Sequence, residues 1–228
     1  MSADGQFGTR FEAILFDFDG VLIDSEYVGN RHIAEFLSSI GHPTSIADSM
    51  ANFMGLSGAD FIGAIERWID RPLPAAFHDI RREEDARVMR DGVPSVDGAI
   101  EFVLRLPPAL PKAIASSSTT QWITAHLAHI GLQAAFGAMI FSGKEHVVRG
   151  KPAPDLYLHA ARQLGVAIER TVVIEDSPVG VTGAVASGAH VIGLCAGLHC
   201  GPDHAARLRA LGVHDVAHDF AEVARLIA

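Results

Sequence analysis

The chain has 228 residues, of which 49% are hydrophobic and 20% are charged, and its formal net charge is −9. This length and composition indicate a globular protein with a sizeable core, formed by one large α/β domain or by a domain with an insert. The negative charge and the presence of only three lysines disfavour nucleic acid and anionic membranes as partners.

Cysteine usage and the N-terminal sequence indicate the compartment. Two cysteines, Cys195 and Cys200, are too few for a disulfide framework and favour a reducing environment. The first residues, MSADGQFGTRFEA, lack the apolar core of a signal peptide, and no run of 18 apolar residues predicts a membrane span. We therefore expect a cytoplasmic enzyme; the sequence does not indicate its oligomeric state.

Short apolar runs alternate with helical patterns along most of the chain. Five runs have the length and the flanking turn residues of buried strands: 12–16, 112–116, 138–142, 171–175 and 190–194. Helical patterns that end at glycine cover 119–131, 153–165 and 178–188. This alternation predicts an α/β fold with a doubly wound parallel sheet and helices on both faces.

The segment after the first predicted strand has a different character. It contains no convincing strand, and amphipathic helical patterns cover 25–41, 58–70 and 74–92. We expect a small α-helical domain at 24–94, inserted into an α/β core made of residues 1–23 and 95–228.

Polar residues follow the predicted strands at their carboxyl ends, where open parallel sheets bind ligands. Asp17 and Asp19 follow the first strand, and Gly20 then allows a tight turn. The other groups are Ser116, Ser117 and Ser118 after the second strand, Lys151 after the third, and Glu175 and Asp176 at the end of the fourth. We expect all of them at one edge of the sheet.

This set of residue types favours phosphoryl chemistry. Four clustered carboxylates repel one another unless a cation lies among them, and oxygen ligands suit Mg²⁺. A hydroxyl group and an ammonium group beside such a metal can share the charge of a phosphoryl group. One aspartate can attack phosphorus, while a second protonates the leaving alcohol and later activates water.

Four stretches in the expected order resemble the motifs of the haloacid dehalogenase (HAD) superfamily. They are DFDGVLIDSE, IASSST, GKPAPDLY and VIEDSPVG. The resemblance covers essentially the whole chain, and the helical insert is similar to the small cap of subclass I members. It implies a HAD-type α/β core with a cap domain.

The resemblance also implies a role for each matching residue. Asp17 would be the nucleophile and would bind Mg²⁺ through its other oxygen, and Asp19 would be the general acid and base, with its carbonyl on the metal. Ser116 and the Ser117 amide would bind the phosphoryl oxygens, and Lys151 would neutralise charge.

Further positions complete the expected site. Asp176 would bind Mg²⁺, and Glu175 would bind it directly or through water. Gly20 belongs to the expected phosphate-binding loop. In similar proteins a loop between two cap helices selects the substrate, which makes Gly55, Leu56 and Ser57 candidate substrate-binding residues.

Several family activities fit this sequence less well. Dehalogenases of this type lack the second aspartate, whereas Asp19 is present, and phosphonatases need a cap lysine, whereas residues 1–111 contain none. The closest subgroup resembles β-phosphoglucomutase, but Gly29 and Gly58 stand where its histidine and cap arginine are expected. We therefore favour a phosphatase over a mutase.

The expected reaction is Mg²⁺-dependent hydrolysis of a small phosphomonoester, with a sugar phosphate or sugar-acid phosphate as the substrate class implied by the resemblance. A hexose-phosphate mutase is the alternative enzyme. A protein that keeps the fold but only binds a ligand or partner is the alternative from another class, and the intact catalytic set disfavours it.

Some other residues have two interpretations. His199, Cys200 and His204 could form a transition-metal cluster, although a polar loop at the sheet edge is the favoured interpretation. We expect His126 to be a surface residue, and we expect Trp68 and Trp122 to lie in the core because they sit in helical patterns.

Overall fold

A computed structural model of the chain describes residues 9–54, 56 and 58–228. The chain forms two compact units. The first unit runs to Asp24 and resumes at Pro94–Ala228, and the second unit is the intervening segment Ser25–Val93.

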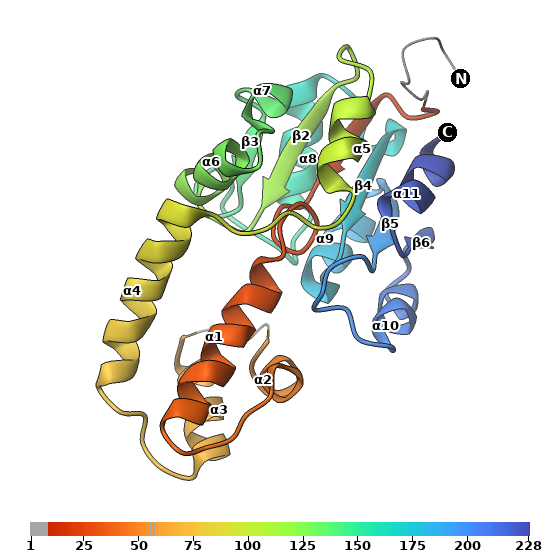
Figure 1. The fold of residues 1–228 in the computed structure, drawn as a ribbon. Coiled ribbons are helices and arrows are strands. Elements are labelled where there is room, and N and C mark those ends of the chain that lie inside the picture. The colour runs from red at the N-terminus through yellow and green to blue at the C-terminus, as the bar shows by residue number, and fades with distance from the viewer. Residues whose placement is uncertain (1–8, 55, 57) are drawn as a thin grey trace. The chain divides into compact units, whose positions relative to one another are not determined.

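The first unit is built on a parallel sheet, shown in Figure 1. Its strands are β1 (Ala13–Phe16), β2 (Lys112–Ser116), β3 (Ile140–Ser142), β4 (Thr171–Glu175), β5 (His190–Leu194) and β6 (Asp215–Ala217). They pair in the order β3-β2-β1-β4-β5-β6, and every pair is parallel. The predicted doubly wound parallel sheet is confirmed, and the five predicted runs all contribute strands. The sixth strand was missed because its three residues form no apolar run.

Helices cover both faces of this sheet. They are α5 (Ala99–Arg105), α6 (Thr120–His129), α7 (Gln133–Phe136), α8 (Asp155–Leu164), α9 (Pro178–Ser187), α10 (His204–Ala210) and α11 (Phe220–Ile227), with a 3-10 turn at Ile168–Arg170. The start of α9 follows from its sequence, because the Ser177 hydroxyl accepts a hydrogen bond from the Gly180 N–H and Pro178 occupies the first turn.

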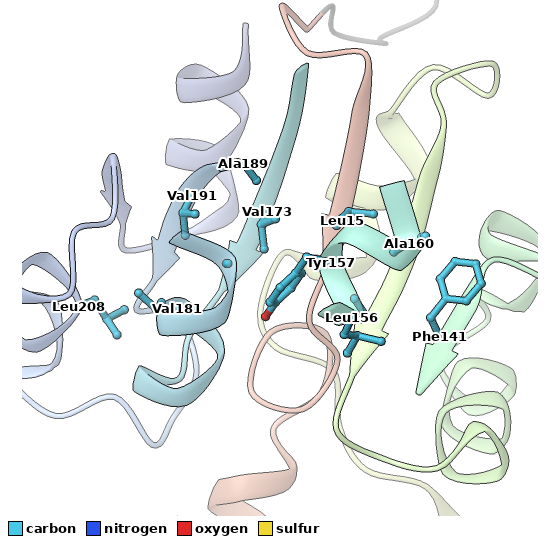
Figure 2. Packing of buried hydrophobic residues seen from close by; sticks show 13 residues of the cluster. Leu15, Phe141, Leu156, Tyr157, Ala160, Val173, Val181, Ala189, Val191 and Leu208 are labelled. Atoms are coloured by element: carbon cyan, nitrogen blue, oxygen red, sulfur yellow. The ribbon is translucent and has the colours of Figure 1, made fainter. Parts of the chain in front are cut away.

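Side chains that alternate along β1 enter two separate packing layers. Leu15 belongs to a cluster that contains Tyr157 of α8, Val173 of β4 and Val181 of α9, and Figure 2 shows these side chains together. The next side chain, Phe16, makes edge-on ring contacts with Phe102 of α5 and Phe136 of α7. The buried strands therefore lie between two layers of helices, which leaves the ends of the strands as the place for polar groups.

The second unit consists of α1 (Ser25–Ser39), α2 (Ile46–Phe53), α3 (Gly58–Ile69) and α4 (Ala76–Asp91). Its core includes Leu37, Phe53, Ile65 and Phe77. The helical character is as predicted, but α2 was missed. Its start carries a capping box, in which Ser45 and Asp48 exchange hydrogen bonds.

The longest described helix, α4, has 16 residues and carries charges along its length. No helix among the described residues is long and apolar enough to cross a bilayer.

Candidate active site

The strand order brings the predicted site residues to one edge of the sheet. Strand β1 lies between β2 and β4, so the residues that follow these three strands are neighbours. Asp17 follows β1 directly, Ser116 ends β2, and Glu175 ends β4 with Asp176 next to it. All four side chains are buried. This edge is the point where the direction of strand crossover reverses, and such points bind ligands in doubly wound sheets.

Lys151 joins two of these carboxylates. Its Nζ atom donates hydrogen bonds to Oδ1 of Asp17 at 2.6 Å and to Oε1 of Glu175 at 2.7 Å. The side chain of Lys151 is only 3% exposed, and that of Glu175 is fully buried. Charged groups this deep in a protein need compensating charge or hydrogen bonds. The long loop from β3 to α8 supplies the ammonium group that these two carboxylates need.

The titration behaviour of the cluster reflects an excess of negative charge. Burial, and then the charge of Glu175, raise the pKa of Asp17 well above its usual value, although Lys151 opposes this. Burial also opposes the ionised form of Glu175, but Lys151 and several hydrogen bonds outweigh it and lower that pKa. Lys151 stays protonated, because the two carboxylates overcome the effect of burial on its pKa. One ammonium group therefore does not balance all the carboxylates around it.

Glu175 is held by neighbours that sequence reasoning did not select. The Tyr157 hydroxyl donates to its Oε1 at 3.1 Å, and the Ser177 N–H donates to its Oε2 at 2.8 Å. Gly180 leaves the space that this carboxylate occupies, because a Cβ at that position would lie 1.4 Å from Oε1. Tyr157 is the last residue of the motif GKPAPDLY and lies on the buried face of the predicted helix. Its place in this motif is the sequence signal that could have identified it as a site residue.

Asp176 contacts the loop that follows β5. His199 Nε2 lies 2.8 Å from its Oδ2 atom, and His204 Nε2 donates to its backbone carbonyl at 2.7 Å. Both histidines are buried. The structure therefore places them at the sheet edge, where a polar loop was the favoured interpretation, and in contact with Asp176. Potential ligand atoms of His199, Cys200 and His204 also lie within 4.8 Å of one another, so the alternative of a transition-metal cluster remains a prediction.

The loop that follows β5 is also hydrogen-bonded to the loop that follows β1. The Leu198 N–H donates to Oδ1 of Asp24 at 2.8 Å. Gly20 has φ +83°, and a Cβ there would lie 2.1 Å from Oδ2 of Asp176. Gly20 is therefore required both by its backbone conformation and by the close approach of Asp176.

Asp19 has partners on the segment that follows β2. Ser118 Oγ donates to its Oδ2 at 2.6 Å, Ser116 Oγ lies 3.4 Å from the same atom, and Trp122 Nε1 donates to Oδ1 at 3.0 Å. Ser117, by contrast, is exposed. Ser118 was expected at this edge but was given no role of its own. Trp122 was absent from the predicted site; it was expected in the core, but it is only partly buried.

The donor set fits a hard divalent cation. Asp17, Glu175 and Asp176 each offer an oxygen atom, and these atoms lie within 4.8 Å of one another in a buried setting. Carboxylate oxygens are the ligands that Mg²⁺ and Ca²⁺ prefer, and the excess negative charge at Asp17 is what such a cation would offset.

The predicted substrate loop lies in the second unit. Leu56, between α2 and α3, is 42% exposed. Gly55 and Ser57 lie outside the described residues, so the proposed substrate-binding role of these three positions stays a prediction.

Comparisons with known proteins agree with this arrangement. A family model described as haloacid dehalogenase-like hydrolase matches residues 11–188. Hexitol phosphatase A of Escherichia coli (strain K12) is 33% identical over 195 residues, which are 80% of this chain and 82% of that protein. The 6-phosphogluconate phosphatase of the same organism is 26% identical over 196 residues, covering 85% and 87%.

A solved structure extends the similarity to the fold. The HAD family hydrolase from Deinococcus radiodurans R1, crystallised with bound phosphate and sodium, is 34% identical and has a TM-score of 0.86. The match covers 97% of this chain and 99% of that chain. The carboxylates at the ends of β1 and β4 are buried and share one lysine. Together with these similarities, this arrangement leads to one conclusion: the chain belongs to the haloacid dehalogenase-like hydrolases.

Proposed function

We propose that this enzyme hydrolyses small phosphorylated sugars or sugar acids, with transfer of the phosphoryl group to Asp17 and with Mg²⁺ as its metal. The family and its phosphatase relatives make the chain a phosphatase. The finer proposal is carried by one observation, the contact of Lys151 with both Asp17 and Glu175 in a buried carboxylate cluster. Such a cluster suits transfer of a phosphoryl group, because charged groups fixed in place can offset the charge that develops during the transfer.

In the first half of the reaction, a carboxylate oxygen of Asp17 attacks phosphorus and the bond from phosphorus to the sugar oxygen breaks. Asp19 gives its proton to the departing alkoxide, which leaves as the alcohol. Ser116 and the Ser117 amide hydrogen-bond the phosphoryl oxygens. Lys151 offsets part of their negative charge.

In the second half, Asp19 takes a proton from water, and the water oxygen attacks the phosphorus of the aspartyl-phosphate. The bond between phosphorus and Asp17 breaks, which releases inorganic phosphate and restores both aspartates. Asp17, Asp176 and Glu175, with the carbonyl of Asp19, would hold Mg²⁺, which when bound supplies positive charge beside the phosphoryl oxygens.

The substrate class rests on similarity. Two relatives are named hexitol phosphatase A and 6-phosphogluconate phosphatase, and both names refer to polyhydroxy compounds. We propose that the helical unit Ser25–Val93 acts as the cap of this enzyme, and that Gly55, Leu56 and Ser57 contact the sugar.

The proposal is tested by phosphate release from a panel of phosphorylated sugars, sugar acids, glycolate and nucleotides, with Mg²⁺ and with EDTA. The variants are Asp17→Asn and the matched control Asp24→Asn. Asp24 is also a buried carboxylate of the same loop, but it accepts a hydrogen bond from the Leu198 N–H, which an asparagine oxygen can also accept. We expect metal-dependent release that Asp17→Asn abolishes and Asp24→Asn retains.

Three results would overturn the proposal. Interconversion of hexose 1- and 6-phosphates on addition of a bisphosphate primer, without net phosphate release, would identify a mutase. Full activity in Asp17→Asn would show that Asp17 does not take part in the reaction. The absence of both phosphate release and interconversion of hexose phosphates would favour a binding protein.

A further inference from the structure

We propose that Trp122 is a positioning residue for Asp19, whose indole N–H directs the catalytic proton to the Oδ2 atom of that carboxyl group. This inference rests on the proposed function, in which Asp19 protonates the leaving alcohol. It concerns a residue that the reaction itself does not touch and that helical periodicity alone would assign to the core.

The two oxygens of Asp19 have partners of different chemistry. Oδ1 lies 3.0 Å from the indole nitrogen of Trp122, and Oδ2 lies 2.6 Å from the hydroxyl of Ser118. An indole N–H can only donate a hydrogen bond, whereas a hydroxyl group can donate or accept. Oδ1 must therefore act as an acceptor whenever this contact is present.

This asymmetry decides which oxygen carries the proton in the acid form. A proton on Oδ1 would point at the indole N–H, and two donors would then face each other. A proton on Oδ2 would instead meet hydroxyl oxygens that can accept it, those of Ser118 and, at 3.4 Å, Ser116. Because Ser116 is proposed to bind the phosphoryl oxygens, the acidic O–H group is kept on the side of the phosphoryl site.

Trp122 itself is held firmly enough to perform this role. Its backbone N–H donates to Oγ1 of Thr119, the capping residue of α6, at 3.3 Å. Its backbone carbonyl accepts a hydrogen bond from Nδ1 of His126 at 2.9 Å. The N–H and the carbonyl group of Trp122 are thus both hydrogen-bonded to side chains, which fixes its backbone at the start of the helix.

The ring of Trp122 is also supported. The imidazole of His126 lies against it, with 4.0 Å between ring centroids and 36° between the planes. His126 is fully buried, which corrects the expectation of a surface residue. One turn of α6 therefore stacks a buried imidazole on the indole, whose nitrogen then meets Asp19.

The test compares substrates that differ in their need for an acid. An alkyl leaving group, as in a sugar phosphate, departs slowly unless it is protonated, whereas p-nitrophenolate is a stable anion and needs little protonation. We would measure kcat/KM, because this ratio covers the steps up to phosphoryl transfer and excludes the later hydrolysis of the aspartyl-phosphate. The substrates are p-nitrophenyl phosphate and the best sugar phosphate of the wild-type enzyme.

The central variant is Trp122→Phe, which keeps an aromatic ring and removes the N–H group. We expect kcat/KM for the sugar phosphate to fall about tenfold, a part of the 10²–10⁴-fold range of general acid catalysis, while kcat/KM for p-nitrophenyl phosphate stays within about twofold. Asp19→Asn should show the same selectivity with a larger loss, because it removes the acid itself.

Trp68→Phe is the matched control. Trp68 is the other tryptophan of the chain, and its indole N–H donates to Oγ1 of Thr44 at 3.0 Å within the second unit. This variant loses an equivalent hydrogen bond that does not involve Asp19, so its kcat/KM should be unchanged for both substrates.

Trp122→Gln serves as a second variant should Trp122→Phe fail to fold, as judged by its melting temperature. It restores an N–H donor without the ring, so it should retain more activity on the sugar phosphate than Trp122→Leu. Equal activity of the Gln and Leu variants would overturn the inference.

The outcomes separate the two proposals. Equal losses on both substrates in Trp122→Phe, or no loss on either, would overturn the positioning role while leaving the phosphatase in place. A wild-type enzyme that releases phosphate from neither substrate would overturn the proposed function and this inference with it.

Discussion

The ammonium group of Lys151 lies 2.6 Å from Oδ1 of Asp17, and both side chains are buried. Replacement of this lysine by methionine leaves carboxylates without their positive partner. We expect Lys151→Met to lower the free energy of unfolding by about 3–5 kcal/mol, the usual effect of breaking a buried ion pair. We also expect kcat to fall by about 10²–10³-fold, because a group that stabilises the phosphoryl charge is lost. Urea unfolding and phosphate release measure the two effects.

Lys112→Met is the control for that change. Lys112 is also buried, but its Nζ atom donates to the backbone carbonyl of Leu110, and burial lowers its pKa. Its removal should cost less than about 1.5 kcal/mol, the usual net contribution of a single hydrogen bond. Equal destabilisation by the two variants would show that the carboxylates around Lys151 contribute nothing specific.

Two glycines in helices should respond in opposite ways to substitution by alanine. At Gly180 the new Cβ would lie 1.4 Å from Oε1 of Glu175, so the carboxylate must move out of its hydrogen bonds. We expect Gly180→Ala to lower the free energy of unfolding by about 3 kcal/mol, as overpacking of a tight core does. At Gly29 no atom outside the adjoining residues and the helix's own backbone lies within 4 Å of the new Cβ, and Gly29→Ala should stabilise α1 by about 0.5–1 kcal/mol. Thermal and urea unfolding test the pair; the same sign for both would contradict the packing argument.

The hydrogen bond from the Leu198 N–H to Asp24 fastens the loop that carries His199. Asp24→Ala removes the acceptor from a buried N–H, and we expect a loss of about 1–3 kcal/mol. Asp24→Asn keeps an acceptor and should be close to the wild type at acidic pH, where Asp24 is also uncharged. Burial raises the pKa of Asp24, so the stability that this group contributes in its protonated form is lost as the pH rises through its folded-state pKa. Asp24→Asn should therefore gain stability relative to the wild type between acidic and neutral pH, and parallel stability profiles would contradict this.

Stability should also decline on acidification, because buried histidines resist protonation. Burial lowers the pKa of His126; Asp19 and the hydrogen bond to the Trp122 carbonyl oppose this shift, and His129 adds to it. Below about pH 6.5 the imidazole binds a proton in the unfolded chain but not in the folded chain. The contribution of His126 to the free energy of unfolding is therefore present above that pH and is lost as the pH falls. We expect His126→Gln to reduce this decline by up to about 1.4 kcal/mol per pH unit.

Urea unfolding at pH 7.5 and pH 5.5 checks the expectation. Other histidines contribute in the same direction, since burial also lowers the pKa of His32, His190 and His204. The variant should therefore flatten the profile without abolishing the slope. An unchanged slope would mean that His126 titrates alike in the folded and unfolded chains.

Local patterns were sufficient for the sheet and for the positions of its polar ends. The strand at 171–175 contains the apolar run 172–174, which Glu175 and Asp176 follow, and such a run between turn signals has few alternatives to a buried strand. Short elements were missed where the local pattern is weak, as in β6, whose three residues are Asp215, Val216 and Ala217. Its pairing with β5 supplies the hydrogen bonds that its own sequence does not predict.

The sequence by itself determined the α/β class, the helical insert and the residues at the ends of β1, β2 and β4, because these follow from periodicity and from motifs of adjacent residues. Only the tertiary structure decided how those residues are supported. Trp122 meets Asp19 across 103 positions of sequence, and Leu198 meets Asp24 across 174. Contacts of this kind depend on strand order and on the packing of helices against the sheet, and no local pattern of residue types encodes them.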